Sequence, residues 1–271
     1  MIFSNMIDAY LANIIIKPFN KKEFESLVSD LASFRKLKKH KKEIQEYLLE
    51  HFYISHQDIF LPKNLRVNNY DIALAYARYY YFSHQSALHI HGLDNSAQQI
   101  IYMSEENIFT SSPSSNLTQS TIDQAFSKPQ RMTTNFKKFN ELTINFLKGQ
   151  SPDHMNTTKD NLRVSDIEKT LIDITVRPSY SGGSKNIMKS FKNARILMDP
   201  EKLVHYYKKL SFAYPYHQSL GFYLENSGYD KAYYRELLQF NHKFNFYLDY
   251  EISNPEYCEK WKIFYDSSVL Q

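Results

Sequence analysis

The apolar positions of the first sixty residues recur at the spacing of helices. One predicted helix begins at Asn20, which forms a capping-box pattern with Glu23 three positions later. Its apolar face consists of Phe24, Leu27, Val28, Leu31 and Phe34. A second predicted helix carries Ile44, Tyr47, Leu48 and His51. Residues 57–61 then favour a short extended segment that ends at Pro62.

Helices followed by an extended wing are typical of a winged helix-turn-helix domain. The same pattern equally fits a small helical packing domain, because the tight glycine turn is missing. From Asn69 a further helix is expected to reach Ala77, and it leads into an extended run over residues 79–82.

Residues 83–92, SHQSALHIHG, favour a short helix. Ser83 is placed to cap its first amides, and Gly92 to end it in the left-handed conformation. A longer motif follows at residues 164–183, where Ser165 and Glu168 match a capping box and Pro178 ends the helix. Gly182 and Gly183 then allow a sharp turn. Asp199 and Pro200 supply the cap and first-turn proline of a helix that ends near Leu210.

The remaining pattern mixes strands with helices. Strands are expected at residues 98–104, 142–147, 162–164, 245–252 and 261–266, and helices around residues 187–191, 220–226 and 232–240. They interleave without regular βαβ repetition. The sequence therefore predicts an α+β (mixed α/β) protein. A mostly helical, winged-helix-like domain covers residues 1–68, and a larger mixed α/β domain covers residues 69–271.

Positive charge is concentrated in one short stretch, although the net charge of the 271-residue chain is only +4. The basic residues of this stretch are Arg35, Lys36, Lys38, Lys39, Lys41 and Lys42. They are either a solvated helix end whose lysines favour the helix dipole, or contacts to nucleic-acid phosphates. Lys63 and Arg66, near the expected wing, are further phosphate-contact candidates or ordinary surface residues.

Several chemistries are not supported by the sequence. The six glycines form neither a dinucleotide fingerprint nor a P-loop, and a single cysteine, Cys258 in a predicted turn, excludes an internal disulfide framework. Of His84, His89 and His91, only the first and last share a helical face, and neither cysteine nor carboxylate lies at ligand spacing beside them. We expect no cofactor, no metal and no catalysis. Without a signal-peptide pattern or a long apolar run, we also expect a cytoplasmic protein without a membrane partner.

Three blocks of the sequence resemble the AbiEi family in their order and spacing. They are YFSHQSALHIHGL, then VSDIEKTLIDITVRPSYSGG, then HQSLGFYLENSGYDKAYYRELL with FYLDYEISNPEYCEKWKIFY. With the stretches between them, the resemblance covers roughly residues 69–265. This family is the antitoxin and repressor half of type IV toxin–antitoxin systems, which act in abortive infection as phage defence. The resemblance implies a winged-helix domain that binds inverted repeats in operator DNA upstream of its own operon, followed by an α/β domain. It also implies an AbiEii-type nucleotidyltransferase toxin as partner, counteracted without a stable complex. Residues 1–62 match the family loosely, so the DNA-contact candidates rest on charge.

Two other functions compete with this one. In a metal-dependent nuclease, Asp249 and Glu251 would lie two apart on a strand, with Lys260 or Lys262 on the next strand. Asp166 and Glu168 are better explained as a helix start. In a protein-interaction antitoxin that binds its toxin directly without DNA, the tyrosine-rich segment would form the contact surface. Its members Tyr216, Tyr223 and Tyr229 would otherwise pack helices together.

Overall fold

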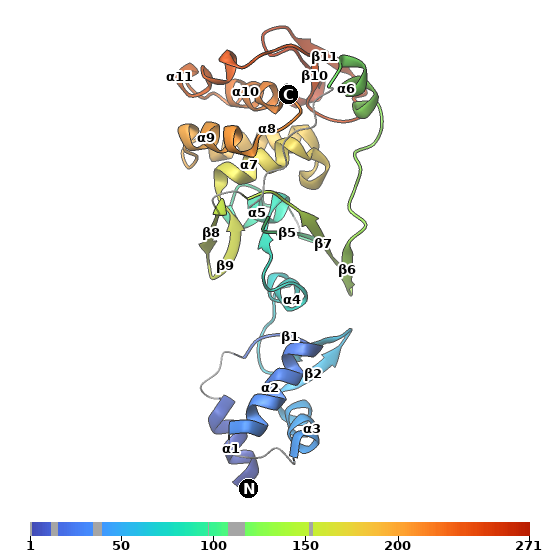
Figure 1. The fold of residues 1–271 in the computed structure, drawn as a ribbon, viewed down its shortest axis with the longest axis vertical. Helices are drawn as coiled ribbons and strands as arrows, with labels where there is room; N and C mark the ends of the chain where they lie inside the picture. The colour runs from blue at the N-terminus through green and yellow to red at the C-terminus, as the bar shows by residue number, and fades with distance from the viewer. Residues whose placement is uncertain (1, 12–15, 35–39, 97, 108–116, 152–153) are drawn as a thin grey trace. The chain divides into compact units, whose positions relative to one another are not determined.

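A computed structural model describes residues 2–11, 16–34, 40–96, 98–107, 117–151 and 154–271 (Figure 1). The chain forms two compact units: residues 1–79 with 139–142, and residues 80–138 with 143–271. The mixed α+β class is as predicted. The division falls at residue 79, eleven residues beyond the predicted boundary, because the helix at residues 69–76 packs within the first unit. Its Ala75 carbonyl accepts from Asn20 Nδ2 at 2.9 Å, and its Tyr76 hydroxyl donates to the Gln57 carbonyl at 3.0 Å.

The first unit has the element order of a winged helix-turn-helix domain. In chain order its elements are α1 (Ile2–Leu11), β1 (Phe19–Asn20), α2 (Lys21–Phe34), α3 (Lys41–His51), β2 (Tyr53–His56), β3 (Ile59–Pro62) and α4 (Asn69–Tyr76). The strands form an antiparallel sheet in the order β1-β3-β2. β2 and β3 form a hairpin whose turn residues, Gln57 and Asp58, both have positive φ. β2 was not predicted.

An apolar core holds α2, α3 and the sheet of this unit together. The predicted face of α2 is buried at Phe24, and α3 buries Ile44 and Leu48. Phe24 stacks on Phe60 of β3, with ring centroids 3.9 Å apart, and meets Tyr53 of β2 edge-on. The capping box at the start of α2 is confirmed: Glu23 N donates to Asn20 Oδ1 at 3.0 Å, and Asn20 N donates to Glu23 Oε2 at 3.2 Å. The chain therefore enters α2 in a fixed direction.

The second unit is built on a six-stranded sheet in the order β6-β7-β5-β4-β9-β8. Its strands are β4 (Tyr81–Phe82), β5 (Ile100–Glu105), β6 (Phe136–Phe139), β7 (Leu142–Lys148), β8 (Asn156–Lys159) and β9 (Leu162–Ser165). β4 pairs parallel with β9, and β5 pairs parallel with β7, whereas β4–β5 and β8–β9 are antiparallel. The sheet is therefore mixed, as the irregular alternation of elements predicted.

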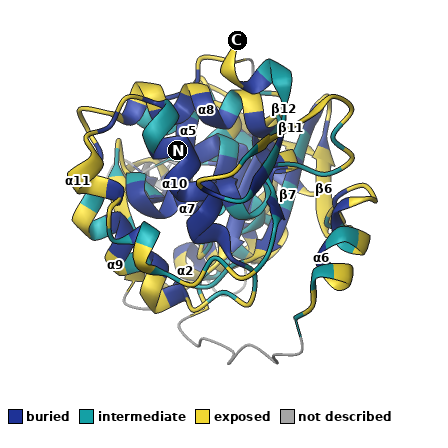
Figure 2. Cartoon of the chain, turned by 90° about the horizontal axis from the view of Figure 1, so that it is seen from above, coloured by how far each residue is buried: buried dark blue, intermediate teal, exposed yellow. Residues whose placement is uncertain are grey.

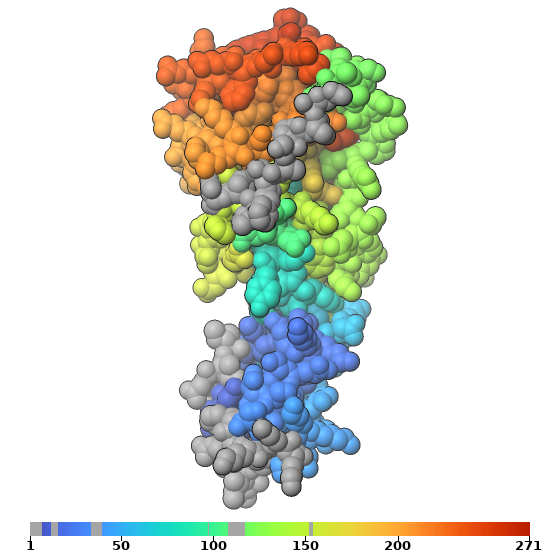
Figure 3. Space-filling model, viewed as in Figure 1, coloured from blue at the N-terminus to red at the C-terminus, as the bar shows by residue number. Residues whose placement is uncertain are grey.

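The helices of the second unit bury most of its apolar side chains. They are α5 (His84–His91), α6 (Gln119–Phe126), α7 (Ile167–Val176), α8 (Gly183–Ala194), α9 (Pro200–Leu210), α10 (Tyr216–Asn226) and α11 (Lys231–Tyr234), with 3₁₀ turns at Pro178–Ser181, Leu237–Gln239 and Ser267–Leu270. α10 is buried over residues 216–224, and Figure 2 shows the buried colour on both α7 and α10. α11 packs on α9 and α10. In Figure 3 the orange surface of residues near 200 lies next to the red-orange surface of residues near 230.

The last three strands form a small second sheet in the order β10-β12-β11. Its strands are β10 (Phe246–Tyr247), β11 (Pro255–Cys258) and β12 (Ile263–Asp266). Cys258 therefore lies in a strand, not in the predicted turn. The predicted strand at residues 245–252 ends at Tyr247, since residues 248–251 form a bend.

Two predicted helix caps are corrected by the structure. Ser83 occupies the cap position of α5, but its hydroxyl bonds to Ser104 Oγ at 2.7 Å. At α7 the cap is Asp166, whose Oδ1 accepts from Lys169 N at 2.9 Å, so the Ser165 capping box was wrong. The buried Ser165 hydroxyl instead meets Thr170 Oγ1 at 2.8 Å. The left-handed Gly92 and Gly182 and the Asp199 cap of α9 are as predicted.

None of the helices within the described ranges is long and apolar enough to cross a membrane.

Gly221 in the middle of α10 provides a test of packing in the second unit. A Cβ at this position would lie 2.1 Å from two ring atoms of Trp261, whose side chain is fully buried. We expect Gly221→Ala to lower the free energy of unfolding in urea by about 2 kcal/mol, because overpacking outweighs the gain in helix propensity. Gly92→Ala is the comparison: its Cβ would meet nothing within 4 Å, so only the backbone strain of about 1 kcal/mol remains. Equal losses in the two variants would contradict the packing argument.

Candidate nucleic-acid interface

α2 and α3 pack against each other in the first unit, and most of the segment between them lies outside the described residues. Ile44 and Leu48 of α3 are fully buried toward α2, whereas Lys41, Lys42 and Gln45 are exposed on α3. In helix-turn-helix proteins the second helix enters the major groove, and its N-terminal residues contact the base edges. The fold therefore presents the first turn of α3 as the candidate contact.

Two of the predicted contact residues lie in that first turn. The Lys42 side chain is 91% exposed, with its Nζ 3.8 Å from Glu46 Oε1. Lys41 Nζ donates to Ser29 Oγ of α2 at 3.1 Å. The other members of the basic stretch, Arg35, Lys36, Lys38 and Lys39, lie outside the described residues.

The position of Lys41 and Lys42 does not fit the alternative in which these two lysines favour the helix dipole. Lysines favour the helix dipole at the C-terminal end of a helix, whereas these two lie at the positive, N-terminal end of α3. There they add positive charge to amides that already attract anions. A phosphate group would be stabilised at this position by both the lysines and the helix start.

The distribution of charge over residues 1–79 points to the same place. This part of the chain has 12 lysines and arginines and 9 aspartates and glutamates, and six of the 12 lie between residues 35 and 42. Without that stretch, acidic residues would outnumber basic ones. α3 itself carries Glu43, Glu46 and Glu50. Attraction to phosphate therefore comes from the basic stretch at residues 35–42, whereas Glu43 in the first turn of α3 and the two glutamates further along repel a non-specific polyanion.

Lys63 lies at the other end of α3. Its Nζ donates to the Glu50 carbonyl at 2.5 Å, and its backbone amide donates to the Phe52 carbonyl at 2.8 Å. Lys63 thus satisfies carbonyls at the end of α3. The 11 residues of α3 span about 15 Å, so Lys63 is separated from Lys41 and Lys42 by the length of the helix. Arg66 is exposed in the segment between β3 and α4.

The tip of the wing is held by other residues of the first unit. Gln57 Oε1 accepts from Asn140 N at 3.1 Å, and His56 Nε2 lies 3.0 Å from Asn140 Oδ1. The Tyr76 hydroxyl donates to the Gln57 carbonyl, as noted for α4. Because these contacts occupy the turn of the hairpin, α3 is a better candidate for the main DNA contact than the wing tip.

The acidic pair proposed for a nuclease does not lie on one strand. Asp249 follows β10 in the bend, and its carboxylate accepts from Ser184 N at 2.8 Å and from Tyr250 N at 2.9 Å. It therefore holds the first turn of α8. Glu251 is exposed with a φ of 48°, and Lys260 pairs with Glu225. Among the residues with described positions, no three His, Cys, Asp or Glu side chains are grouped so that they could hold a metal ion.

The tyrosines considered as a protein-contact surface are buried. The exposed fractions are 8% for Tyr216, 0% for Tyr223 and 6% for Tyr229. Tyr223 stacks on Phe191 of α8, and the Tyr229 hydroxyl donates to the Phe191 carbonyl at 3.0 Å. The helix-packing interpretation of these residues is confirmed.

A polar cluster in the second unit was not predicted as a site. Lys169, Asp173 and Arg177 lie four residues apart along α7 and its C-cap, and His84 starts α5 beside them. The Lys169 side chain is only 2% exposed and pairs with Asp173. The sequence held a signal, since charges at positions i, i+4 and i+8 share one helical face. The apolar positions of this helix, and the spacing of His84 to other histidines, do not reveal the cluster.

Comparison with known proteins bears on the fold. No family model matches the chain, and no curated protein matches it. Among solved structures, the chain is similar to the crystal structure of the RV2827C protein from Mycobacterium tuberculosis, with a TM-score of 0.60 and 12% sequence identity. The match covers 100% of this chain and 93% of that chain. At this identity the likeness shows the fold alone.

The charge arrangement at α3 predicts how the first unit responds to substitution. We expect Lys41→Gln with Lys42→Gln to leave the free energy of unfolding within about 0.5 kcal/mol of the original protein, because both side chains are exposed at an unfavourable helix end. Asn20→Ala should instead cost about 1 kcal/mol, because it removes the cap of α2 and the bond to Ala75. Urea titrations followed by circular dichroism measure both. A large loss in the double lysine variant would show that the lysines are structural.

Proposed function

We propose that the protein is a DNA-binding transcriptional repressor and the antitoxin of a type IV toxin–antitoxin system. The observation that carries the DNA-binding part is the pair of exposed lysines, Lys41 and Lys42, at the start of α3, the helix that would enter the major groove in a helix-turn-helix. They weaken the helix on its own, and a bound phosphate reverses that effect. The order β2–β3 after α3 supports a winged-helix mode of binding.

In this proposal the basic stretch at residues 35–42 contacts phosphates and sets the position of the unit on the duplex. Gln45 is exposed one turn further along α3, and a glutamine amide can pair with adenine in the major groove. Glu46, on the same helix, disfavours DNA that offers only phosphates. Inverted-repeat operators would place two copies of the chain on the DNA.

The antitoxin part rests on the resemblance of residues 69–265 to the AbiEi family. It assigns to the second unit the task of counteracting a nucleotidyltransferase-type toxin, and it places the protein in the cytoplasm with its DNA. Direct toxin binding through exposed tyrosines draws less support, because Tyr216, Tyr223 and Tyr229 are buried. The nuclease alternative loses its acidic pair, because Asp249 is engaged by α8.

Binding to the DNA upstream of its own reading frame tests the repressor. We expect Lys41→Gln with Lys42→Gln to weaken promoter binding at least about tenfold near 0.15 M salt, and to lower the slope of log affinity against log salt by about 2. Fluorescence anisotropy with labelled promoter DNA over a salt series measures both quantities.

Two matched variants accompany this measurement. Lys189→Gln with Lys192→Gln removes the same charge from an exposed face of α8 and should leave the affinity unchanged. Lys41→Arg with Lys42→Arg keeps the charge and should retain binding. If the α3 variant binds promoter DNA with the original affinity at every salt concentration, Lys41 and Lys42 do not contact the phosphates of the DNA.

Growth of a host that expresses the neighbouring reading frame, which the proposal expects to encode a nucleotidyltransferase, tests the antitoxin. We expect the toxin to arrest growth and the chain, expressed from an unrelated promoter, to restore it. The variant with Lys41→Gln and Lys42→Gln should restore growth equally, because the resemblance that carries this part of the proposal lies beyond residue 68. Arrest that persists while the full-length chain accumulates would contradict the antitoxin assignment and leave the DNA-binding assignment to its own test.

A further inference from the structure

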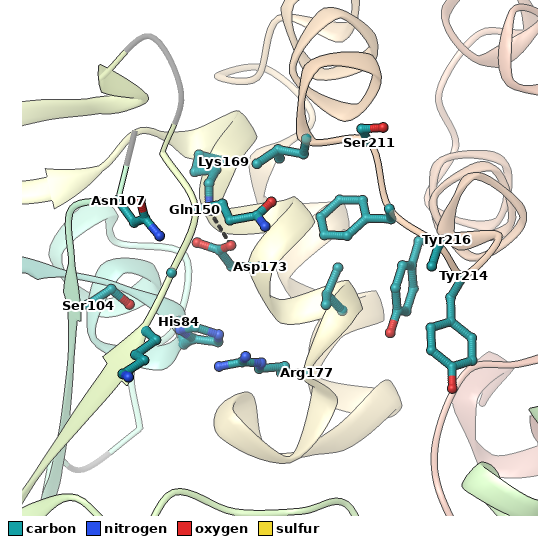
Figure 4. Close-up of a pocket in the computed structure, with 16 residues that line it drawn as sticks. His84, Ser104, Asn107, Gln150, Lys169, Asp173, Arg177, Ser211, Tyr214 and Tyr216 are labelled. Carbon is teal, nitrogen blue, oxygen red and sulfur yellow. Dashed lines mark hydrogen bonds and ion pairs between the residues drawn. The ribbon is translucent and has the colours of Figure 1, made fainter. Parts of the chain in front are cut away.

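The second unit contains a cavity of about 410 Å³ next to the polar cluster of α7 (Figure 4). Its walls come from the start of α5, the ends of β5 and β7, α7, and the loop between α9 and α10. The volume is within the range of pockets that hold small organic ligands. All of its lining residues belong to the second unit, so the cavity is independent of the proposed DNA interface.

Positive charge exceeds negative charge on the walls. Lys148, Lys169 and Arg177 line the cavity together with a single carboxylate, Asp173. Burial raises the pKa of Asp173, and the paired Lys169 ammonium opposes that shift. The ion pair of Lys169 and Asp173 is neutral as a unit, which leaves the charges of Lys148 and Arg177 to attract an anion. Figure 4 shows Arg177 directed toward the interior.

His84 adds an uncharged polar group to the same wall. Burial, assisted by the nearby charges of Arg177 and Lys169, holds the pKa of His84 well below its usual range, so the imidazole is neutral. Its Nδ1 lies 3.0 Å from Ser83 Oγ, which fixes the ring. Its φ of 52° is unusual: among the described non-glycine residues with positive φ, His84 is the buried one. Backbone strain of this kind is often maintained at ligand sites.

The opposite wall is aromatic. Phe212, Tyr214 and Tyr216 line the cavity, and Figure 4 shows the two tyrosines across from His84. Tyrosine faces stack on planar heterocycles, and an arginine binds phosphate oxygens through two parallel hydrogen bonds. A ligand that satisfies both walls is planar at one end and anionic at the other.

We propose that this cavity binds a nucleotide, with its base against Tyr214 and its phosphate toward Arg177 and Lys148. A nucleotide has both a planar ring, which suits the aromatic wall, and a phosphate, which suits the basic wall. The nucleotide has two sources, a free mononucleotide or the end of a single-stranded nucleic acid. The cavity shares Ser211, Phe212 and Tyr214 with one neighbouring pocket, and Lys148, Arg177 and Tyr216 with another, so a strand could continue from it.

Isothermal titration calorimetry on the full chain tests the proposal. The probes are the four 5′-nucleoside monophosphates, inorganic phosphate and a 5′-phosphorylated hexanucleotide. We expect at least one monophosphate to bind with a dissociation constant below about 1 mM, and inorganic phosphate to bind at least about tenfold more weakly. A hexanucleotide that binds more tightly than every monophosphate identifies a strand end as the source, whereas equal or weaker binding identifies the free nucleotide.

The variants separate the two walls. Arg177→Gln should weaken nucleotide binding about tenfold or more, and Tyr214→Leu should do the same while Tyr214→Phe retains binding, because the ring is kept. Arg235→Gln, an exposed arginine near α11, is the charge control and should change nothing. If Arg177→Gln does not fold, as judged by thermal unfolding, the exposed Lys148→Gln tests the same charge. The proposal is overturned if no probe binds at millimolar concentration, if phosphate binds as well as the nucleotides, or if the folded variants of both walls bind like the original chain.

Discussion

The packing of α3 on α2 is the constraint on which the account of the first unit depends. Ile44 and Leu48 are fully buried in that contact, so the side of α3 that meets solvent is fixed by the core and not by surface charge. The same contact leaves the first turn of α3 open, with Lys41 and Lys42 at the positive end of the helix dipole. The capping box of Asn20 and Glu23 fixes the start of α2, against which α3 packs, and Arg78 forms an ion pair with Glu23. A helix start that is electrostatically unfavourable alone becomes favourable beside a phosphate.

Much of the first unit could be predicted because its signals are local. One helix contains both the capping box of Asn20 and Glu23 and the apolar face that begins at Phe24, so residues close in sequence predict them. β2 could not be predicted in the same way, since only Tyr53 of its four residues is buried and no alternation exists to detect. At α7 the sequence offered both Ser165 and Asp166 as caps, and burial of the serine beside Thr170 decided between them. The Asn69 helix was found, but its membership of the first unit depends on contacts 55 residues apart in the chain.

The candidate sites also differ in whether a local sequence pattern reveals them. The basic stretch was visible in the sequence, and the structure adds that its described part lies at the start of a helix. The role of Lys63 required the fold, because Glu50, whose carbonyl it contacts, lies across a helix end and a hairpin. The cavity of the second unit is assembled from four separate parts of the chain, so no local pattern reveals it. Only the spacing of Lys169, Asp173 and Arg177 hinted at a polar face on α7. The expectation that Asp249 and Glu251 share a strand was wrong for a similar reason, because Asp249 lies in a bend that the strand pattern did not predict.

A directed cleavage experiment tests the central claim most directly, since the chain has a single cysteine, Cys258, that can be replaced by serine. In that background, Glu43→Cys in the first turn of α3 carries an iron chelate that cuts DNA close to its point of attachment, and Lys189→Cys carries the same probe on α8. With promoter DNA, the account predicts discrete cleavage within an inverted repeat from the probe at position 43 and a different pattern, or none, from position 189. Uniform cleavage from position 43, or discrete cleavage from position 189 alone, would contradict the assignment of α3 to the DNA.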